Sequence, residues 1–335
     1  MKLTTVAFVL AALPILASAH HSVAAIYDFA DVQEVAGTVT DVDWINPHIR
    51  LTVEAAGTGE IWQLEASAIN VLERNGVARD SFQIGDEMTF IGPVARNGSN
   101  TMAAAVAVTP SGERVSLFTL IASRLGLEAA DPNGLAFDKP SAEAAAADRG
   151  TGLFKVWTPR GRPETGNNAY FWPLTESAKA AVAEYDPLVD DPALLCETPG
   201  MPVIIDNPFP IGFSEENGNI VIRYEEWDAV RTILMDTDAP APSGRTLMGH
   251  SVGRWESDTL VVETTNIDYA YFDDRGTPQS EQLEVIEHYT VTADGNRLDW
   301  DATITDSEVF TEPVVFDGYM EWFRGEELKP YNCTY

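Results

Sequence analysis

Hydrophobic and polar positions alternate along residues 36–117 in short segments that turn-forming residues separate. Segments 37–44, 48–53 and 60–64 are rich in β-branched and aromatic residues and are bounded by Gly, Asn or Pro, which is typical of strands. Residues 68–76 predict one short helix with Gly76 as its C-cap. Two more strands, 87–91 and 101–108, flank an Asn97-Gly98 turn. This order predicts an OB-like five-stranded barrel.

A second strand-and-turn pattern begins at Pro208. The candidate strands are 219–227, 229–235, 250–256, 259–266, 282–292, 297–305 and 314–323. Asn217-Gly218 and Asp294-Gly295 are typical hairpin turns. Seven or eight antiparallel strands with few helices predict a barrel or a sandwich, and a lipocalin-like barrel is the preferred form. Such a barrel commonly holds one small ligand.

These patterns predict a mainly β protein with a defined order of parts. The parts are a signal peptide (1–19), the OB-like domain (20–120), a linker (121–155) and the antiparallel barrel domain (156–335). The linker is rich in Ala, Asp and Glu, and residues 157–199 are rich in Pro and Asn. We therefore expect 157–199 to wrap the second barrel, with one helix near 175–185.

The first nineteen residues have the layout of a secretory signal. Lys2 precedes an apolar run over 6–16, and Ala17-Ser18-Ala19 is a typical cleavage site. The run is too short to span a bilayer comfortably, and no later stretch is long and apolar enough for a membrane anchor. The sequence predicts a periplasmic or secreted protein without membrane insertion.

Export and charge restrict the chemistry further. The 335-residue chain contains two cysteines, Cys196 and Cys333, and an oxidising compartment favours a disulfide between them. The formal net charge of −31 repels phosphate backbones and anionic lipids, so nucleic acid is an unfavourable partner. A small molecule is the expected partner, and neither its identity nor the oligomeric state follows from the sequence.

Strand pleating predicts which ionisable side chains face the barrel interior. Residues i, i+2 and i+4 share one face, so Glu226, Glu287, His250 and Arg254 fall on faces that are otherwise apolar. A His beside a carboxylate in an apolar cup can perform acid–base chemistry. We expect a lyase or isomerase step in which His250 or Glu287 is the acid or base, Glu226 orients the His, and Arg254 stabilises negative charge. The alternatives are a structural ion-pair cluster, or a bulge that turns these residues outward.

Aromatic side chains should supply the apolar surface of this ligand site. The candidates are Tyr224, Trp255, Tyr289, Trp300 and Trp322. No dinucleotide fingerprint, phosphate-binding loop or Cys/His run is present, so no cofactor is expected in the barrel. His288 has the opposite parity and is expected on the solvent face.

Two other functions are compatible with short motifs. Cleavage after Ala19 would make His20 the first residue, and its α-amine and ring, with His21 or His48, would suit Cu(II). The simpler interpretation is that cleavage merely exposes a His. Residues 249–253 match the G-x-S-x-G pattern of serine hydrolases, with Ser251 as the nucleophile. That chemistry needs a helix straight after the Ser, whereas residues 254–265 predict a strand.

The first half resembles an uncharacterised family of small bacterial envelope proteins. The similarity lies in His20-His21-Ser22, Gly37-Thr-Val-Thr, Trp44-x-Asn46-Pro47-His48 and Gly85-Asp86, and covers roughly residues 20–117. The resemblance implies no agreed activity and supplies no catalytic residues.

The second half resembles a domain of uncharacterised exported bacterial proteins. The similarity lies in the segment from Met248 to Glu256, in 258–262, and in Cys333 near the end. It agrees with export and with a β-rich fold, and it implies no particular chemistry.

Overall fold

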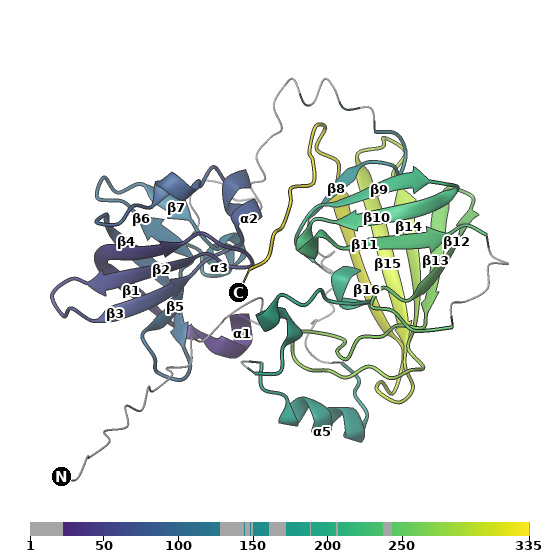
Figure 1. Ribbon diagram of the computed structural model, residues 1–335, viewed down its shortest axis with the longest axis horizontal. Helices are drawn as coiled ribbons and strands as arrows, with labels where there is room; N and C mark the ends of the chain where they lie inside the picture. The colour runs from purple at the N-terminus through teal and green to yellow at the C-terminus, as the bar shows by residue number, and fades with distance from the viewer. Residues whose placement is uncertain are drawn as a thin grey trace, which may run out of the picture.

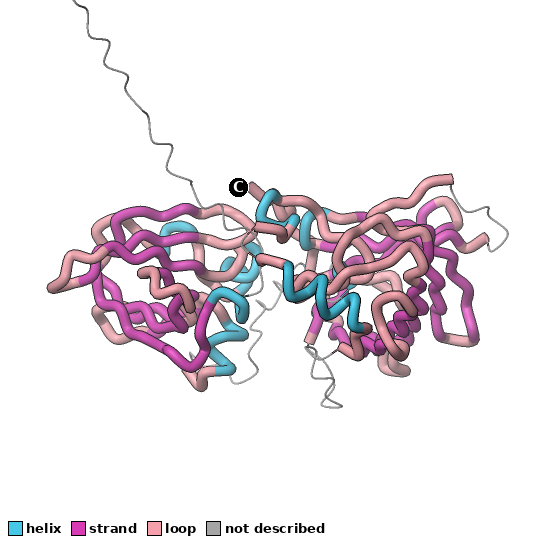
Figure 2. Tube along the Cα trace, turned by 90° about the horizontal axis from the view of Figure 1, so that it is seen from below, coloured by secondary structure: helices cyan, strands magenta, loops and turns pink. Residues whose placement is uncertain are grey.

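The computed structural model describes residues 23–127, 144, 148, 150–160, 172–187, 189–205, 207–236 and 243–334. Within these residues the chain forms two β-barrels that lie next to each other, with the C-terminal tail between them (Figures 1 and 2). The predicted mainly β class is therefore confirmed. The predicted signal peptide lies outside the described residues.

The first barrel has the strand order of an OB fold. Its elements are α1 (Val23–Ile26), β1 (Tyr27–Asp43), β2 (Arg50–Ala55), β3 (Ile61–Glu65), α2 (Ile69–Arg74), η1 (Arg79–Ser81), β4 (Glu87–Ala95), β5 (Thr101–Ala103), β6 (Val106–Val108), β7 (Arg114–Ser116) and α3 (Thr119–Arg124). Strands β1-β2-β3-β5-β4 form a ring that the β1–β4 pairing closes, and β3 and β5 are parallel. Because β1 shifts register against both partners, it bends enough to pair with β2 and β4.

The second barrel closes with nine strands. Its elements are β8 (Val156–Pro159), α5 (Glu176–Glu184), η2 (Pro192–Leu195), η3 (Val203–Ile205), β9 (Ile211–Glu216), β10 (Asn219–Tyr224), η4 (Glu226–Asp228), β11 (Val230–Leu234), β12 (His250–Glu256), β13 (Thr259–Thr265), β14 (Glu284–Val291), β15 (Arg297–Thr305) and β16 (Val314–Glu321). They follow the order β10-β11-β12-β13-β14-β15-β16-β8-β9.

Two features of the second barrel differ from the sequence prediction. Strand β8 comes from the segment expected to wrap the barrel, and it closes the sheet between β16 and β9. The β11–β12 pair is parallel, and its register joins only Ile233 with Ser251 and Leu234 with Val252. The other neighbouring pairs are antiparallel, as predicted. The β11–β12 seam is therefore short, like the two ladders of β8, and among the described strands of this barrel it alone is parallel.

The inward side chains of the second barrel form one contiguous apolar cluster. Leu260, Val262, Leu298 and Ala302 are fully buried within it, and Tyr289 lies beside them. Strand alternation in segments 282–292, 297–305 and 314–323 predicts inward positions for Tyr289, Leu298 and Phe316, and all three side chains are buried. Strands β14, β15 and β16 alternate because one face lines this cluster while the other is more exposed, whereas β10 and β13 are also buried at Val221 and Val261 on the other face.

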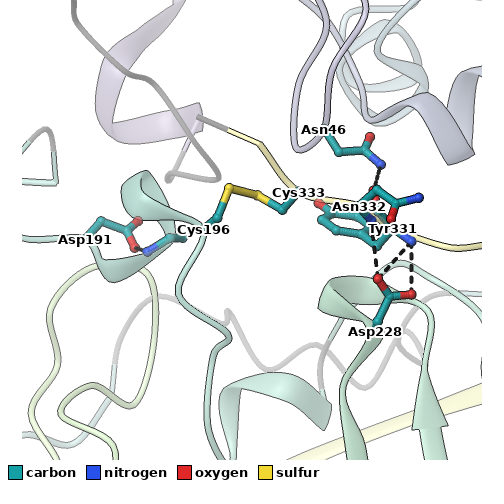
Figure 3. Close-up of a disulfide and its surroundings, with 8 residues drawn as sticks. Asn46, Asp191, Cys196, Asp228, Tyr331, Asn332 and Cys333 are labelled. Carbon is teal, nitrogen blue, oxygen red and sulfur yellow. Dashed lines mark hydrogen bonds between the residues drawn. A yellow bond between two sulfur atoms is a disulfide. The ribbon is translucent and has the colours of Figure 1, made fainter.

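A disulfide fixes the C-terminal tail beside the second barrel (Figure 3). Cys196, at the end of η2, is bonded to Cys333 across a sequence separation of 137 residues, as predicted. Closing a loop of this length stabilises the fold by about 5 kcal/mol in the chain-entropy model. The Asp228 carboxylate accepts the backbone N–H of Tyr331 at 3.0 Å and that of Asn332 at 3.3 Å. The tail is therefore held at two points of one barrel.

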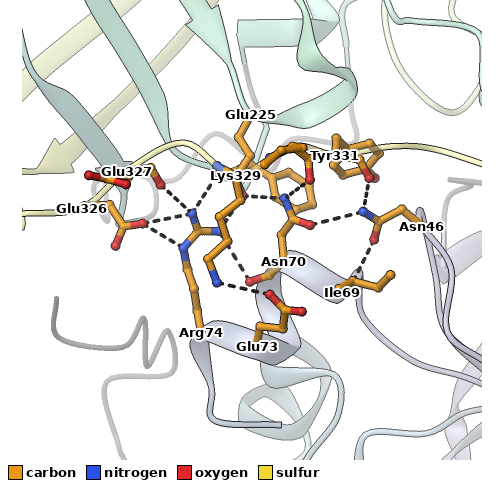
Figure 4. Close-up of polar contacts among 12 residues, drawn as sticks. Asn46, Ile69, Asn70, Glu73, Arg74, Glu225, Glu326, Glu327, Lys329 and Tyr331 are labelled. Atoms are coloured by element: carbon orange, nitrogen blue, oxygen red, sulfur yellow. Dashed lines mark hydrogen bonds and ion pairs between the residues drawn. The ribbon is translucent and has the colours of Figure 1, made fainter. Parts of the chain in front are cut away.

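The same tail is also bonded to the first barrel. Asn46 donates its side-chain N–H to the Tyr331 carbonyl, and its backbone carbonyl accepts the N–H of Thr334 at 3.0 Å. Its side-chain oxygen accepts the N–H of Ile69 at 2.8 Å, which orients the start of α2 (Figure 4). Asn46, part of the Trp-x-Asn-Pro-His motif, thus joins the two barrels through the tail.

A buried arginine makes further bonds between the two barrels. We call these bonds, together with those of Asn46, the joint. Arg74 lies on α2 with 2% of its surface exposed, and its Nη2 donates to Glu225 Oε2 at 2.6 Å (Figure 4). Its Nε donates to Glu326 Oε1 of the tail at 3.0 Å. Glu225 also accepts the N–H of Lys329 at 2.8 Å and the side-chain N–H of Asn70 at 3.0 Å. Glu225 of the second barrel is therefore bonded both to the first barrel and to the C-terminal tail.

Replacing Arg74 with Met should weaken the joint by about 3–5 kcal/mol, because Glu225 would stay buried without its cation. We expect the barrels to separate at a lower urea concentration while their strands stay folded. Small-angle X-ray scattering should then show a larger radius of gyration at unchanged far-ultraviolet circular dichroism. R79M, which changes an exposed arginine of the same domain, is the matched control. A single unfolding transition at the wild-type midpoint would contradict the prediction.

Candidate functional site

Glu287 lies inside the second barrel, as the pleat predicted, but its partner is a residue that sequence reasoning missed. Arg231 of β11 donates from Nη1 to Glu287 Oε1 at 2.9 Å, and both side chains are fully buried. The same guanidinium donates to Ser251 Oγ at 2.9 Å and to Thr264 Oγ1 at 2.6 Å. Strand alternation applied to β11 would have predicted an inward Arg231, since Arg231 shares a face with buried Ile233.

Two tyrosines border this ion pair. Tyr289 donates its hydroxyl to Glu287 Oε1 at 2.6 Å, and burial together with that carboxylate raises the pKa of Tyr289 well above its usual value. Burial raises the pKa of Tyr224 to about 12. Burial alone would lower the pKa of Arg231, but Glu287 more than offsets this and raises it. Both phenols are therefore protonated at neutral pH.

The predicted inward direction of His250 and Arg254 is wrong. On β12 the buried positions are Ser251 and Gly253, whereas Arg254 is exposed and donates to Glu256 Oε1 at 2.8 Å. The inward direction was expected because His250 and Arg254 share the parity of apolar Val252, but Val252 itself is only half-buried. Small residues face inward instead, because a Cβ at position 253 would lie 2.6 Å from Ile233 Cγ2.

Glu226 is buried, but not on the barrel wall where the pleat placed it. Strand β10 ends at Tyr224, and Glu226 lies in the turn η4, at the end of the barrel that meets the first domain. Burial raises the pKa of Glu226 to about 8. Burial also raises the pKa of Tyr331 and Tyr269 nearby, with a smaller contribution from the Glu226 carboxylate to each. The four predicted acid–base residues are therefore not brought together in one cluster.

The five predicted aromatic residues lie in three different surroundings. Tyr224, Tyr289 and Trp300 are buried in the core cluster. Trp322 is half-buried, with Lys155 Nζ at 3.9 Å from its ring centroid, and it donates to Asp148 Oδ2 at 3.0 Å. Trp255 is 46% exposed and shares the inward face of β12 with Ser251 and Gly253.

Trp255 borders a pocket at the hairpin end of the second barrel, which we call the rim pocket. Its volume is about 420 Å³, and its lining consists of Phe154, Glu215, Gly218, Ile220, Met235, Gly253, Arg254 and Trp255. The pocket lies where β12 continues past β11, because residues 253–256 have no β11 residue opposite them. The short β11–β12 seam thus leaves a gap between β10 and β12.

The G-x-S-x-G pattern does not form a nucleophile elbow. Ser251 lies within β12 with 2% exposure, its Oγ is hydrogen-bonded to Arg231 and Thr264, and strand β13 follows instead of a helix. His288 faces the other side of the wall, where its Nδ1 lies 2.8 Å from Asp301 Oδ2. The expectation that His288 lies on the solvent face is confirmed.

Of the three candidate copper ligands, the structure describes His48 alone. Its ring is 4% exposed, and Nδ1 lies 2.8 Å from the Ala66 carbonyl and 3.6 Å from Glu65 Oε1. Tyr27 donates to the other oxygen of Glu65 at 3.1 Å. His20 and His21 lie outside the described residues. Within the described ranges, no group of three or more His, Cys, Asp or Glu could hold a metal ion.

The N-terminal part of the chain matches one known family model. Residues 8–104 match the model of a family of unknown function, DUF6152, and this match ends before the second barrel. This match fits the expectation that the N-terminal part resembles an uncharacterised family. No curated protein and no solved structure matches the chain. Among the described residues, no helix has the length and hydropathy to cross a membrane.

The raised pKa of Glu226 predicts a pH-dependent stability. Between pH 4.5, the ordinary pKa of a glutamate, and about pH 8, Glu226 of the folded chain keeps a proton that the unfolded chain releases. Stability should therefore fall as pH rises through this window, by at most about 1.4 kcal/mol per pH unit. The change E226Q removes the titrating carboxyl group and with it this pH dependence. The free energy of unfolding of E226Q relative to wild type should therefore grow from pH 4.5 to 8, and the difference should vanish below pH 4.

Urea unfolding at several pH values measures this difference directly. E113Q, which changes an exposed carboxyl group of the first barrel, is the control and should follow wild type. If the curves of E226Q and wild type run parallel from pH 4 to 8, the predicted proton on Glu226 is absent.

Proposed function

We propose that this protein is an exported binding protein whose C-terminal barrel holds a small apolar or aromatic ligand in the rim pocket. The observation that carries the proposal is the pocket itself, whose volume of about 420 Å³ lies in the usual range for small-molecule sites. Ile220 and Met235 supply apolar surface, and Trp255 offers an accessible ring for stacking.

Export is supported by the signal-like N-terminus and by the disulfide. Such a disulfide is typical of oxidising compartments outside the cytosol. The similarity of the second half to uncharacterised exported bacterial proteins agrees with a periplasmic or secreted location. On this proposal the ion pair of Arg231 and Glu287 supports the wall beneath the pocket, and no catalytic step is assigned.

Replacing Trp255 with Ala should weaken ligand binding about fivefold, because the loss of one stacking contact costs about 1 kcal/mol. The probe is N-phenyl-1-naphthylamine, a neutral dye whose fluorescence rises in apolar surroundings. Titration of the disulfide-bonded mature protein gives the dissociation constant.

A matched control separates the pocket from general surface hydrophobicity. I84A removes a more exposed apolar side chain, 71% accessible, from the first barrel and should bind the dye as wild type does. The larger residue in M235W should fill the pocket and abolish binding. Dye affinity that is unchanged in both W255A and M235W would contradict the proposed function.

Copper binding at the mature N-terminus is a second candidate, and the hydrogen bond of His48 favours it. With Nδ1 donating to the Ala66 carbonyl, the ring lone pair is on Nε2. Metal-binding histidines commonly have this arrangement, because the backbone bond fixes both tautomer and orientation. His21 precedes α1 by two residues in the sequence. Helix α1 leads directly into Tyr27, which donates to Glu65, and Glu65 lies beside His48.

The copper proposal predicts that one added Gly before His20 lowers Cu(II) affinity more than about tenfold, since the amine–imidazole chelate would be lost. Competition with a chelator measures the affinity, and electron paramagnetic resonance reports the nitrogen ligands. An added Gly at the C-terminus is the control. Equal affinity with and without the N-terminal Gly would exclude a site built on the His20 amine.

A further inference from the structure

The rim pocket contains a carboxylate on its inward side. Ile211 and Phe213 of β9 are buried and face the barrel interior, and Glu215 is the next residue of the same alternation. Glu215 is exposed because the strand reaches the mouth of the barrel at this point, and it lines the pocket. Glu215 and Trp255 thus lie on the inward faces of two strands that border the same opening.

The basic side chains around the pocket are engaged elsewhere. Arg254 is bonded on the outer face to Glu256 and Glu263. Lys155 donates from Nζ to the Gly295 carbonyl at 2.6 Å and lies against the Trp322 ring. Arg223 pairs with Glu216, the outward neighbour of Glu215, at 2.6 Å. Within the described part of the chain, no cation is paired with Glu215.

The aromatic side chains of the lining suit the body of an organic cation. The electron-rich faces of Trp255 and Phe154 attract cations as well as apolar groups. The formal charge of −31 also raises the local concentration of cations around the whole molecule and disfavours anions.

We propose that the rim pocket selects small organic cations that carry an apolar or aromatic body, with Glu215 as the counter-ion of the ammonium group. This inference rests on the proposed function of the pocket and names its ligand class. The apolar lining binds the body of the ligand, and Glu215 distinguishes a cation from a neutral or anionic analogue of the same shape.

Three indole probes of similar size test this selectivity. They are tryptamine, which is a cation at neutral pH, neutral 3-methylindole, and the anion indole-3-propionate. In calorimetric titrations of the disulfide-bonded mature protein, tryptamine should bind at least fivefold more tightly than 3-methylindole, and indole-3-propionate should bind most weakly. Because the preference is electrostatic, it should shrink as salt is raised from 20 to 500 mM.

The variant E215Q should remove most of the preference for tryptamine while leaving the affinity for 3-methylindole within twofold of wild type. E216Q is the matched control: it changes the net charge equally, on the adjacent outward carboxylate that pairs with Arg223. It should keep the full preference for tryptamine.

The outcomes separate this inference from the proposed function. If neither the indoles nor the naphthylamine dye bind, the pocket is not a ligand site and both are overturned. If 3-methylindole binds but tryptamine binds no better, or if E216Q lowers the preference as much as E215Q, the ligand-class inference alone is overturned.

Discussion

The guanidinium of Arg231 bonds the strands on both sides of the short parallel β11–β12 seam of the second barrel. From β11 it reaches Ser251 on β12, Thr264 on β13 and Glu287 on β14, so one side chain connects four successive strands. The β11–β12 ladder has a register of only two residue pairs. A buried charge-assisted network of this kind depends on all its members, because losing either ion would leave the other buried without its partner. The same short ladder leaves the rim pocket open, so the reinforcement and the opening are two consequences of one topological feature.

Strand β10 has the rim pocket at one end and the joint between the two barrels at the other. Gly218 and Ile220, at its start, line the pocket, whereas Glu225, just past its end, receives Arg74 of the first barrel. The joint is polar and passes through the C-terminal tail, which the disulfide holds in place (Figure 3). The first barrel is therefore attached at the end of the second barrel opposite the rim pocket, and this contact leaves the pocket mouth uncovered.

The sequence predicted the elements well and their long-range partners poorly. The strand–helix–strand order of the first barrel and the inward faces of β14, β15 and β16 followed from local alternation, which depends on burial alone. Strand β8 is four residues long and carries too little alternation to be recognised. Arg74 and Glu225 are far apart in the sequence, and nothing local to either residue indicates that they meet. The Cys196–Cys333 pair was predictable, because the count of two cysteines left one pairing.

The failure on β12 has a physical explanation that also accounts for its motif. Gly249 has a φ of +67°, and a Cβ there would lie 2.7 Å from the Thr265 carbonyl oxygen, so the turn into β12 requires glycine. Ser251 supplies a hydroxyl to Arg231. A Cβ at Gly253 would lie 2.9 Å from Met235 Sδ, so a larger residue there would push Met235 out of its place in the pocket lining. Each fixed position of the hydrolase-like pattern thus has a packing role in the seam, and Gly253 in particular preserves the depth of the rim pocket.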